Sequence, residues 1–214
     1  MTRFAFADPD VLGDYNKGGA ALTPPAALMP PPTPMPRILI LYATTEGHTA
    51  RIAERIAQVL RDHGHAVEAH PADATPVGLN PAVYNGVIVG ASVHYGRHPG
   101  YLRALVRGHR TALAKQPGAF FSVSLSAGGP GAKPEAAQRY LETFLRQVGW
   151  RPQQTATVAG ALQYSKYGML KRLLVRVFVG VAGGDTDTSR DYEYTDWDAV
   201  ERFADAFAQR IEQA

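Results

Sequence analysis

The chain has 214 residues, of which 45% are hydrophobic, and this is enough for one well-buried α/β domain. Its formal net charge of +3 is too small to indicate a nucleic-acid partner, and we expect none. The sequence contains no cysteine, which excludes disulfides, thiolate metal sites and thiol nucleophiles.

Residues 1–34 differ in composition from the rest of the chain. They contain two proline clusters, scattered charges and no sustained hydrophobic period. Acidic residues interrupt any apolar segment that a secretory signal would need. We therefore expect a disordered, proline-rich extension before a domain that spans residues 35–214. Met35 lies just before the first predicted strand, separated from it by Pro36, and we hypothesise that translation starts there.

The first predicted strand runs from Arg37 to Tyr42, and its continuous apolar residues indicate burial on both faces. A hydroxyl-rich turn follows and leads into an amphipathic helix over 50–62. The first turn of such a helix offers unpaired backbone N–H groups and a positive dipole end, which favour an anion. The predicted phosphate-binding residues are Thr44, Thr45, Glu46, Gly47, His48 and Thr49.

The kind of phosphate follows from what this loop lacks. A nucleoside triphosphate loop requires a lysine, and neither lysine nor arginine occurs between Thr44 and Thr49. Gly47 is the only glycine in the loop, so the dinucleotide fingerprint is also absent. The loop therefore favours a single terminal monophosphate, with flavin mononucleotide (FMN) as the leading ligand. An alternative is that the threonines only cap the helix.

Strands and helices alternate along the rest of the chain. This alternation predicts a doubly wound α/β fold with a five-stranded parallel sheet in the order 2-1-3-4-5. The further predicted strands are 66–70, 86–92, 119–124 and 155–161, and the further predicted helices are 100–114, 135–148 and 197–211. Ligands of such sheets bind at the carboxyl ends of the strands, so three loops should converge there.

The second and third of these loops are predicted to hold a flat ring. Tyr95 offers a stacking surface, and Gly96 allows close approach of the backbone. His94 and Arg97 are the predicted catalytic residues, and with His98 they would add positive charge near the flavin. The ring-binding residues predicted on these loops are Ser92, Val93, His94, Tyr95, Gly96, Ser124, Leu125, Ser126, Ala127 and Gly128.

Other interpretations of these loops remain open. Tyr95 and the histidines could simply be solvated surface side chains. His94 and His98 have the i,i+4 spacing of metal ligands on a helix, but Pro99 favours a loop and no carboxylate ligand is near in sequence, so we expect no metal.

The segment 162–191 is an insertion between the fifth strand and the final helix. Its apolar residues from Met169 to Val181 follow a helical period but are too few to span a bilayer. A basic amphipathic helix can lie on an anionic membrane surface, or it can pack on its own protein. The predicted substrate or membrane contacts are Lys166, Lys171, Arg172 and Arg176.

Several motifs in this order resemble one family. Residues 44–49 resemble the phosphate loop of flavodoxins. The region from Met35 onward resembles the flavodoxin-like, quinone-dependent protoporphyrinogen IX dehydrogenases of bacterial haem biosynthesis. The narrower motifs are Gly90–Gly96, Phe121–Leu125, Trp150–Pro152, Ala159–Tyr164, Gly183–Thr188 and Tyr194–Trp197. The proline-rich extension and the glycine-rich stretch 126–133 depart from the family pattern.

The resemblance implies FMN as cofactor and removal of six electrons from protoporphyrinogen IX to give protoporphyrin IX. Membrane menaquinone or ubiquinone would accept the electrons, which implies a cytoplasmic enzyme held peripherally on the inner face of the cell membrane. One alternative is a soluble flavodoxin-type electron carrier, although such carriers are usually acidic and this chain is basic. Another is an NAD(P)H-quinone reductase of related fold, for which we find no nicotinamide site.

Overall fold

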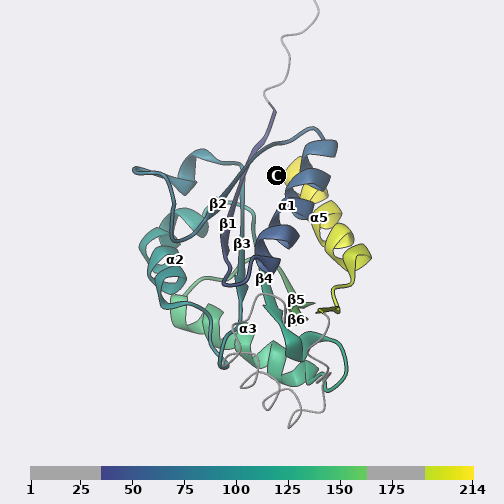
Figure 1. Ribbon diagram of the computed structural model, residues 1–214. Helices are drawn as coiled ribbons and strands as arrows, with labels where there is room; N and C mark the ends of the chain where they lie inside the picture. Colours follow the sequence, from purple (N-terminus) through teal and green to yellow (C-terminus); the bar gives the residue numbers. More distant parts are fainter. Residues whose placement is uncertain (1–34, 163–190) are drawn as a thin grey trace, which may run out of the picture. The chain divides into compact units, whose positions relative to one another are not determined.

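The computed structural model describes residues 35–162 and 191–214. Five parallel strands form its main sheet in the order β2-β1-β3-β4-β5 (Figure 1). Their bounds are β1 Arg37–Ala43, β2 Ala66–Pro71, β3 Gly86–Ser92, β4 Gly118–Ser124 and β5 Gln154–Ala159. The strand order predicted from the sequence is confirmed. The predictions for residues 1–34 and for most of the insertion lie outside the described residues.

Helices cover both faces of this sheet (Figure 1). Helices α1 (His48–Asp62) and α5 (Trp197–Glu212) pack on one face, while α2 (Gly100–Leu113) and α3 (Pro134–Val148) pack on the other. Two short 3₁₀ helices, η1 (Pro81–Val83) and η2 (Leu125–Ala127), lie in the connections. None of the helices described here is both long and apolar enough to cross a membrane.

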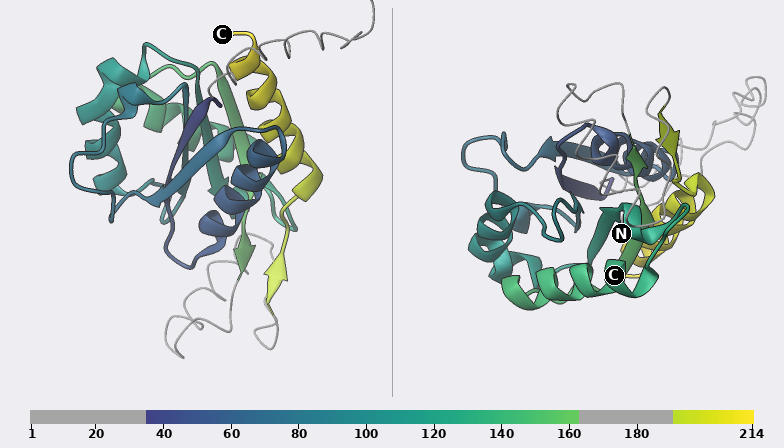
Figure 2. Two further views of the ribbon diagram at one scale, coloured as in Figure 1. Left: turned by 90° about the horizontal axis from the view of Figure 1, so that it is seen from above. Right: turned by 60° about the horizontal axis from the view of Figure 1, so that its bottom comes forward.

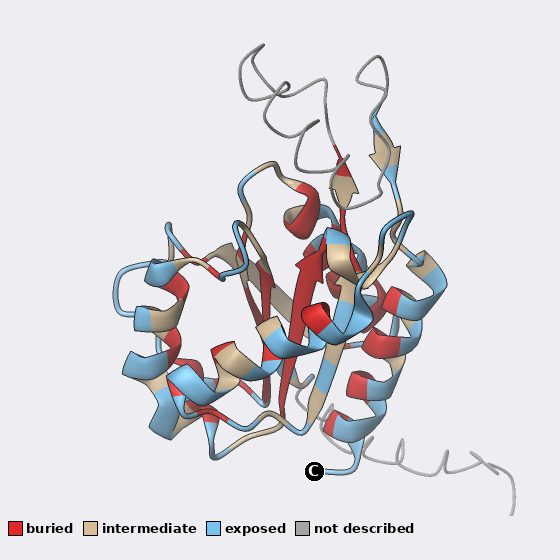
Figure 3. Cartoon of the chain, turned by 90° about the horizontal axis from the view of Figure 1, so that it is seen from below, coloured by how far each residue is buried: buried red, intermediate tan, exposed pale blue. Residues whose placement is uncertain are grey.

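The apolar run in β1 is explained by its central position. Ile38 and Ile40 belong to the core under α1 and α5, whereas Leu39 and Leu41 belong to the core under α2 and α3. All four side chains are at most 1% exposed. Full burial of such a side chain contributes about 1.5–3 kcal/mol, so β1 stabilises both layers. Figure 3 shows the buried residues concentrated on the central strands and on the helix faces toward them.

The predicted fifth strand is divided in two, which corrects the sequence-based bounds. Strand β5 ends at Ala159, and the N–H of Gly160 donates to the carbonyl of Ser124. The next residues form β6 (Ala161–Leu162), which pairs antiparallel with β7 (Tyr192–Glu193) in a separate ribbon (Figure 2). The residues that flank the two ends of the insertion are therefore held side by side.

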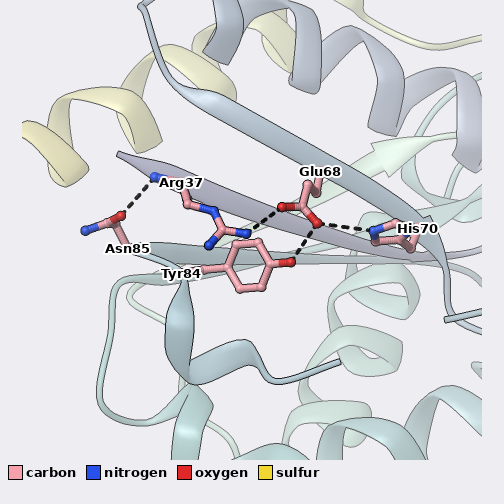
Figure 4. Close-up of polar contacts among 5 residues, drawn as sticks. All are labelled: Arg37, Glu68, His70, Tyr84 and Asn85. Atoms are coloured by element: carbon pink, nitrogen blue, oxygen red, sulfur yellow. Dashed lines mark hydrogen bonds and ion pairs between the residues drawn. The ribbon is translucent and has the colours of Figure 1, made fainter. Parts of the chain in front are cut away.

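A polar network covers part of edge strand β2 (Figure 4). The Glu68 carboxylate accepts hydrogen bonds at 2.8 Å from Arg37 Nη2 and from the Tyr84 hydroxyl, and His70 Nε2 lies 3.6 Å away. The Arg37 guanidinium also stacks over the Tyr84 ring. The backbone N–H of Arg37 donates to the side-chain oxygen of Asn85. The bonds from Arg37 and then Tyr84 lower the pKa of Glu68. This network ties β2 to the start of β1.

Candidate functional site

Three loops meet at the carboxyl edge of the sheet, as the sequence predicts. They follow β1, β3 and β4, which are neighbours in the sheet. The hydroxyl of Ser92 donates to the carbonyl of Ala43 at 3.4 Å, and the N–H of Val93 donates to the carbonyl of Val123 at 2.8 Å. These bonds align the carboxyl ends of the three strands. The loop predicted to bind phosphate and the two loops predicted to bind the flat ring therefore face one site.

The loop before α1 exposes the amino end of the helix. Gly47 is the N-cap residue with φ of 89°, a left-handed conformation that suits glycine. Among the described residues, no side chain caps the first turn of α1, and that turn carries no acidic residue. In contrast, Asp196 caps α5 by accepting from the N–H of Ala199 at 2.9 Å. The amino end of α1 is thus suited to binding an anion.

The predicted threonines of this loop have different surroundings. Thr44 Oγ1 accepts the N–H of Gly47 at 2.9 Å, which fixes the turn and leaves the hydroxyl hydrogen to be donated to a ligand. Thr45 is exposed, whereas Thr49 is 1% exposed. The loop therefore combines one ordering threonine, one exposed hydroxyl and one that lies within the helix packing.

The side chain of His48 extends to the C-terminal part of the chain. Its Nε2 atom lies 2.6 Å from Oγ1 of Thr195, and that hydroxyl donates its single hydrogen to the carbonyl of Ala159 at 2.8 Å. Thr195 must therefore accept from His48, so Nε2 carries the hydrogen. The His48 ring also meets Trp197 edge-on, with centroids 6.2 Å apart. The Nε2 atom of His48 is therefore directed to Thr195 rather than to the predicted phosphate.

The loop after β3 forms a tight two-residue hairpin. The N–H of His94 donates to the carbonyl of Arg97 at 2.9 Å, and the reverse bond is 3.0 Å. Tyr95 and Gly96 both have positive φ, at 49° and 75°, as a type I′ turn requires. For a tyrosine this conformation costs about 1–2 kcal/mol, yet the residue is 89% exposed. The predicted stacking residue is therefore presented to solvent at the carboxyl edge.

The two predicted catalytic residues face different neighbours. His94 Nε2 lies 3.4 Å from the Glu46 carboxylate, which connects the phosphate loop to the hairpin. Arg97 lines a cavity between α2 and α3. The expectation that His98 adds positive charge is wrong: burial, followed by the nearby Arg103 charge, lowers the pKa of His98 to about 4, so it is neutral at pH 7. Its Nε2 atom pairs with the Ser122 hydroxyl at 2.9 Å.

The loop after β4 is shaped by contact with Tyr194. A Cβ atom at Gly129 would lie 2.7 Å from the Tyr194 ring, and one at Gly128 would lie 2.7 Å from the Ala159 side chain. The Ser124 hydroxyl at the start of this loop is buried and has no hydrogen-bond partner in the described part of the chain. An unpaired buried hydroxyl at a strand end is suited to a ligand that supplies the missing bond. Of the other predicted ring contacts, Leu125 is 37% exposed and belongs to η2 with Ser126 and Ala127.

A group of residues that we did not predict joins α1 to the ribbon β6–β7. Arg51 pairs with Glu193 at 2.9 Å and stacks over the Trp197 ring, whose Nε1 donates to Glu193 at 2.7 Å. The only sequence signal for this group is the motif Tyr194–Trp197.

The predicted substrate or membrane contacts all lie outside the described residues; they are Lys166, Lys171, Arg172 and Arg176. No cluster of three or more metal-ligating side chains occurs in the described parts.

Comparison with known proteins places this geometry in a family. A flavodoxin-domain family model matches residues 39–189. The chain is 37% identical to the protoporphyrinogen IX dehydrogenase [quinone] of Leishmania major over 81% of this chain and 75% of that protein. It is 35% identical to the protein of the same name from Escherichia coli K12, over 78% of this chain and 92% of that protein. The chain belongs to this family of flavodoxin-domain dehydrogenases.

Solved structures similar to this family member agree on the fold. A short-chain flavodoxin associated with a bacterial microcompartment matches with a TM-score of 0.52 at 12% identity, over 83% of this chain and 99% of that one. A flavodoxin variant from Pseudomonas aeruginosa matches with a TM-score of 0.51 at 15% identity, over 82% and 99%. The predicted flavodoxin-like fold is confirmed, and the flavodoxin domain marks the chain as a flavin-binding protein.

Proposed function

We propose that this protein oxidises protoporphyrinogen IX to protoporphyrin IX with FMN as cofactor and a membrane quinone, menaquinone or ubiquinone, as electron acceptor. The observation that carries the proposal is the 35% identity to the Escherichia coli protoporphyrinogen IX dehydrogenase [quinone] over 92% of its length. The site geometry supports it, because the uncapped amino end of α1 lies beside the loops after β3 and β4.

The chain has residues that fit both the terminal phosphate and the flavin ring of FMN. The amides of the first turn of α1, with the hydroxyls of Thr44 and Thr45, would hold the terminal phosphate. The exposed Tyr95 ring would cover the flavin ring, and the unpaired Ser124 hydroxyl would bond to its polar edge. Bound FMN supplies a two-electron acceptor, which the six-electron oxidation uses three times with quinone as the final oxidant.

Each oxidation step also releases protons, and His94 is placed to accept one. The Glu46 carboxylate at 3.4 Å from His94 Nε2 would hold the imidazole ring in one orientation. The positive φ of Tyr95 and Gly96 turns the hairpin back tightly, so His94 stays beside the phosphate loop. We assign His94 as the proton acceptor and Arg97 as a substrate-binding cation.

The proposed location is the cytoplasmic face of the inner membrane, with peripheral attachment. A membrane quinone has to be met at a bilayer surface. The basic and apolar residues of 162–191 have the composition of a surface-binding segment. Flotation of the full chain with anionic and with neutral vesicles tests this, and equal absence from both fractions would contradict it.

The reaction is tested by anaerobic assay of the purified full chain loaded with FMN. Protoporphyrinogen IX and a soluble quinone are added, and porphyrin fluorescence and quinone reduction are followed together. We expect three quinones to be reduced for each porphyrin formed, and no porphyrin without quinone. A normal flavin absorbance spectrum with no porphyrin formation would instead support the electron-carrier alternative.

A further inference from the structure

A cavity of 460 Å³ lies between α2 and α3, next to the hairpin that carries Tyr95. Three arginines line it from three separate elements. Arg97 comes from the hairpin, Arg103 from α2 and Arg139 from α3. The aromatic side chains of Tyr140 and Phe144 complete one wall, so the cavity combines a cationic rim with an apolar surface.

No acidic residue in the described part of the chain pairs with these arginines. None of the residues that line the cavity is acidic, and neither the Arg97 nor the Arg139 side chain forms an ion pair or hydrogen bond with another described residue. Arg103 Nη1 donates to the Gln147 side-chain oxygen at 3.1 Å, and Arg107 Nε donates to the Gln147 carbonyl at 2.8 Å. Both of these bonds are to neutral oxygen atoms, so they orient the cations without cancelling their charge.

Like charges held at one cavity repel one another, and each guanidinium retains donors that are not used. A carboxylate offers two oxygens in the plane that an arginine fork matches, with bonds stronger than those between neutral groups. The Tyr140 and Phe144 side chains favour a ligand whose carboxylate is attached to an apolar body. His98, which also lines the cavity, is neutral at pH 7 and adds no charge of either sign.

We propose that the α2–α3 cavity binds the carboxylates of an amphiphilic anion, and that in this protein these are the propionate groups of the tetrapyrrole. The identity of the anion rests on the proposed function, whereas the cavity itself does not. Its position supports the assignment. A Cβ atom at Gly96 would lie 3.5 Å from the Tyr140 ring, so the cavity wall packs directly against the hairpin that would cover the flavin.

The cavity is tested by binding rather than by turnover. Fluorescence titrations of the FMN-loaded full chain would use protoporphyrin IX and its dimethyl ester, which lacks both carboxylates. The variants are Arg139→Gln and Arg103→Gln, and the matched control is Arg110→Gln, an exposed arginine of α2 that does not line the cavity. Far-ultraviolet circular dichroism and thermal melting would establish that all variants are folded.

We expect the Kd for protoporphyrin IX to rise about tenfold in each cavity variant, which is the loss of one charge-assisted contact of about 1.4 kcal/mol. The dimethyl ester should bind the wild type weakly, and its Kd should be the same for the wild type and the cavity variants. Unchanged binding of the diacid in both cavity variants would overturn the proposal.

Two further outcomes separate this inference from the proposed reaction. If the cavity variants weaken diacid binding but the wild type fails to oxidise the porphyrinogen, the carboxylate site stands and the reaction assignment fails. A parallel titration with inorganic phosphate distinguishes the source of the anion. If phosphate binding needs the arginines while protoporphyrin binding does not, the tetrapyrrole assignment is overturned.

Discussion

The Nε2 atom of His48 lies 2.6 Å from the Thr195 hydroxyl, which in turn donates to the carbonyl of Ala159. This chain of bonds joins the first residue of α1, the end of β5 and the segment that follows β7. Because α1 begins at the proposed phosphate site, residues far apart in the sequence determine how that helix end is oriented. His48 therefore acts as a positioning residue through its side chain.

We predict that Thr195→Val weakens FMN binding by about tenfold, since the amino end of α1 loses its lateral support. The unfolding free energy should fall by about 1–2 kcal/mol because a buried histidine hydrogen bond is lost. Thr195→Ser, which retains the hydroxyl, is the matched control and should resemble the wild type. Flavin fluorescence quenching measures the Kd, and equal affinity in the two variants would contradict the positioning role.

Gly47→Ala should reduce both stability and FMN affinity, because φ is 89° there and an alanine is strained in that region. The expected loss of stability is about 1–2 kcal/mol. Gly64 provides a matched control, since it has φ of 82° just after the other end of α1, and a Cβ atom there would have no heavy atom within 4 Å. Gly64→Ala should lower stability similarly but leave the FMN Kd unchanged. If both variants bind FMN equally well, Gly47 is not part of the phosphate site.

The Tyr84→Phe variant tests the network on β2. Tyr84 is 7% exposed, and its hydroxyl donates to Glu68 at 2.8 Å. Glu68 is partly exposed, so water can replace the lost partner and we expect a loss of only about 1 kcal/mol in urea unfolding. Tyr101→Phe, at a more exposed tyrosine on α2, is the control and should lose less. No change in FMN binding is expected, because this network lies on β2 and the start of β1.

The sheet order and most element bounds could be predicted because the sequence pattern reports burial directly. The run Ile38–Leu41 is apolar at every position, and each of these residues is buried in one of two cores. Hydrophobic period similarly defines α1, α2 and α3 to within two residues. The carboxyl-edge location of the site then follows from topology alone.

The details that were missed depend on contacts between distant residues. His98 was expected to be a cation, but it is packed against Phe120 and Phe144, with ring centroids 5.6 and 5.0 Å away, and burial keeps it neutral. A histidine in a loop sequence gives no sign of that burial. Likewise, nothing local in the sequence shows that Glu193 pairs with Arg51, 142 residues away. Composition identifies such residues as polar but does not identify their partners.

His98 also gives the protein a specific pH dependence. Its pKa is about 4 in the folded state, where burial disfavours the charged form, compared with 6.5 for an unperturbed histidine. Between these values the unfolded chain binds more protons than the folded chain, so stability falls as the pH is lowered from about 6.5 and the decline levels off near 4. This histidine should remove about 2 kcal/mol of stability between pH 7 and pH 5.

The measurement is urea unfolding at pH 7 and pH 5 for the wild type, His98→Gln and His109→Gln. His98→Gln should be less stable at pH 7, because the contact with Ser122 is altered, but its stability should depend less on pH by about 2 kcal/mol. His109→Gln, on the same side of the sheet in α2, should retain the wild-type dependence. Burial also lowers the pKa of His65, so part of the acid destabilisation should persist in both variants. A wild-type pH dependence in His98→Gln would mean that His98 is already protonated in the folded protein at pH 5.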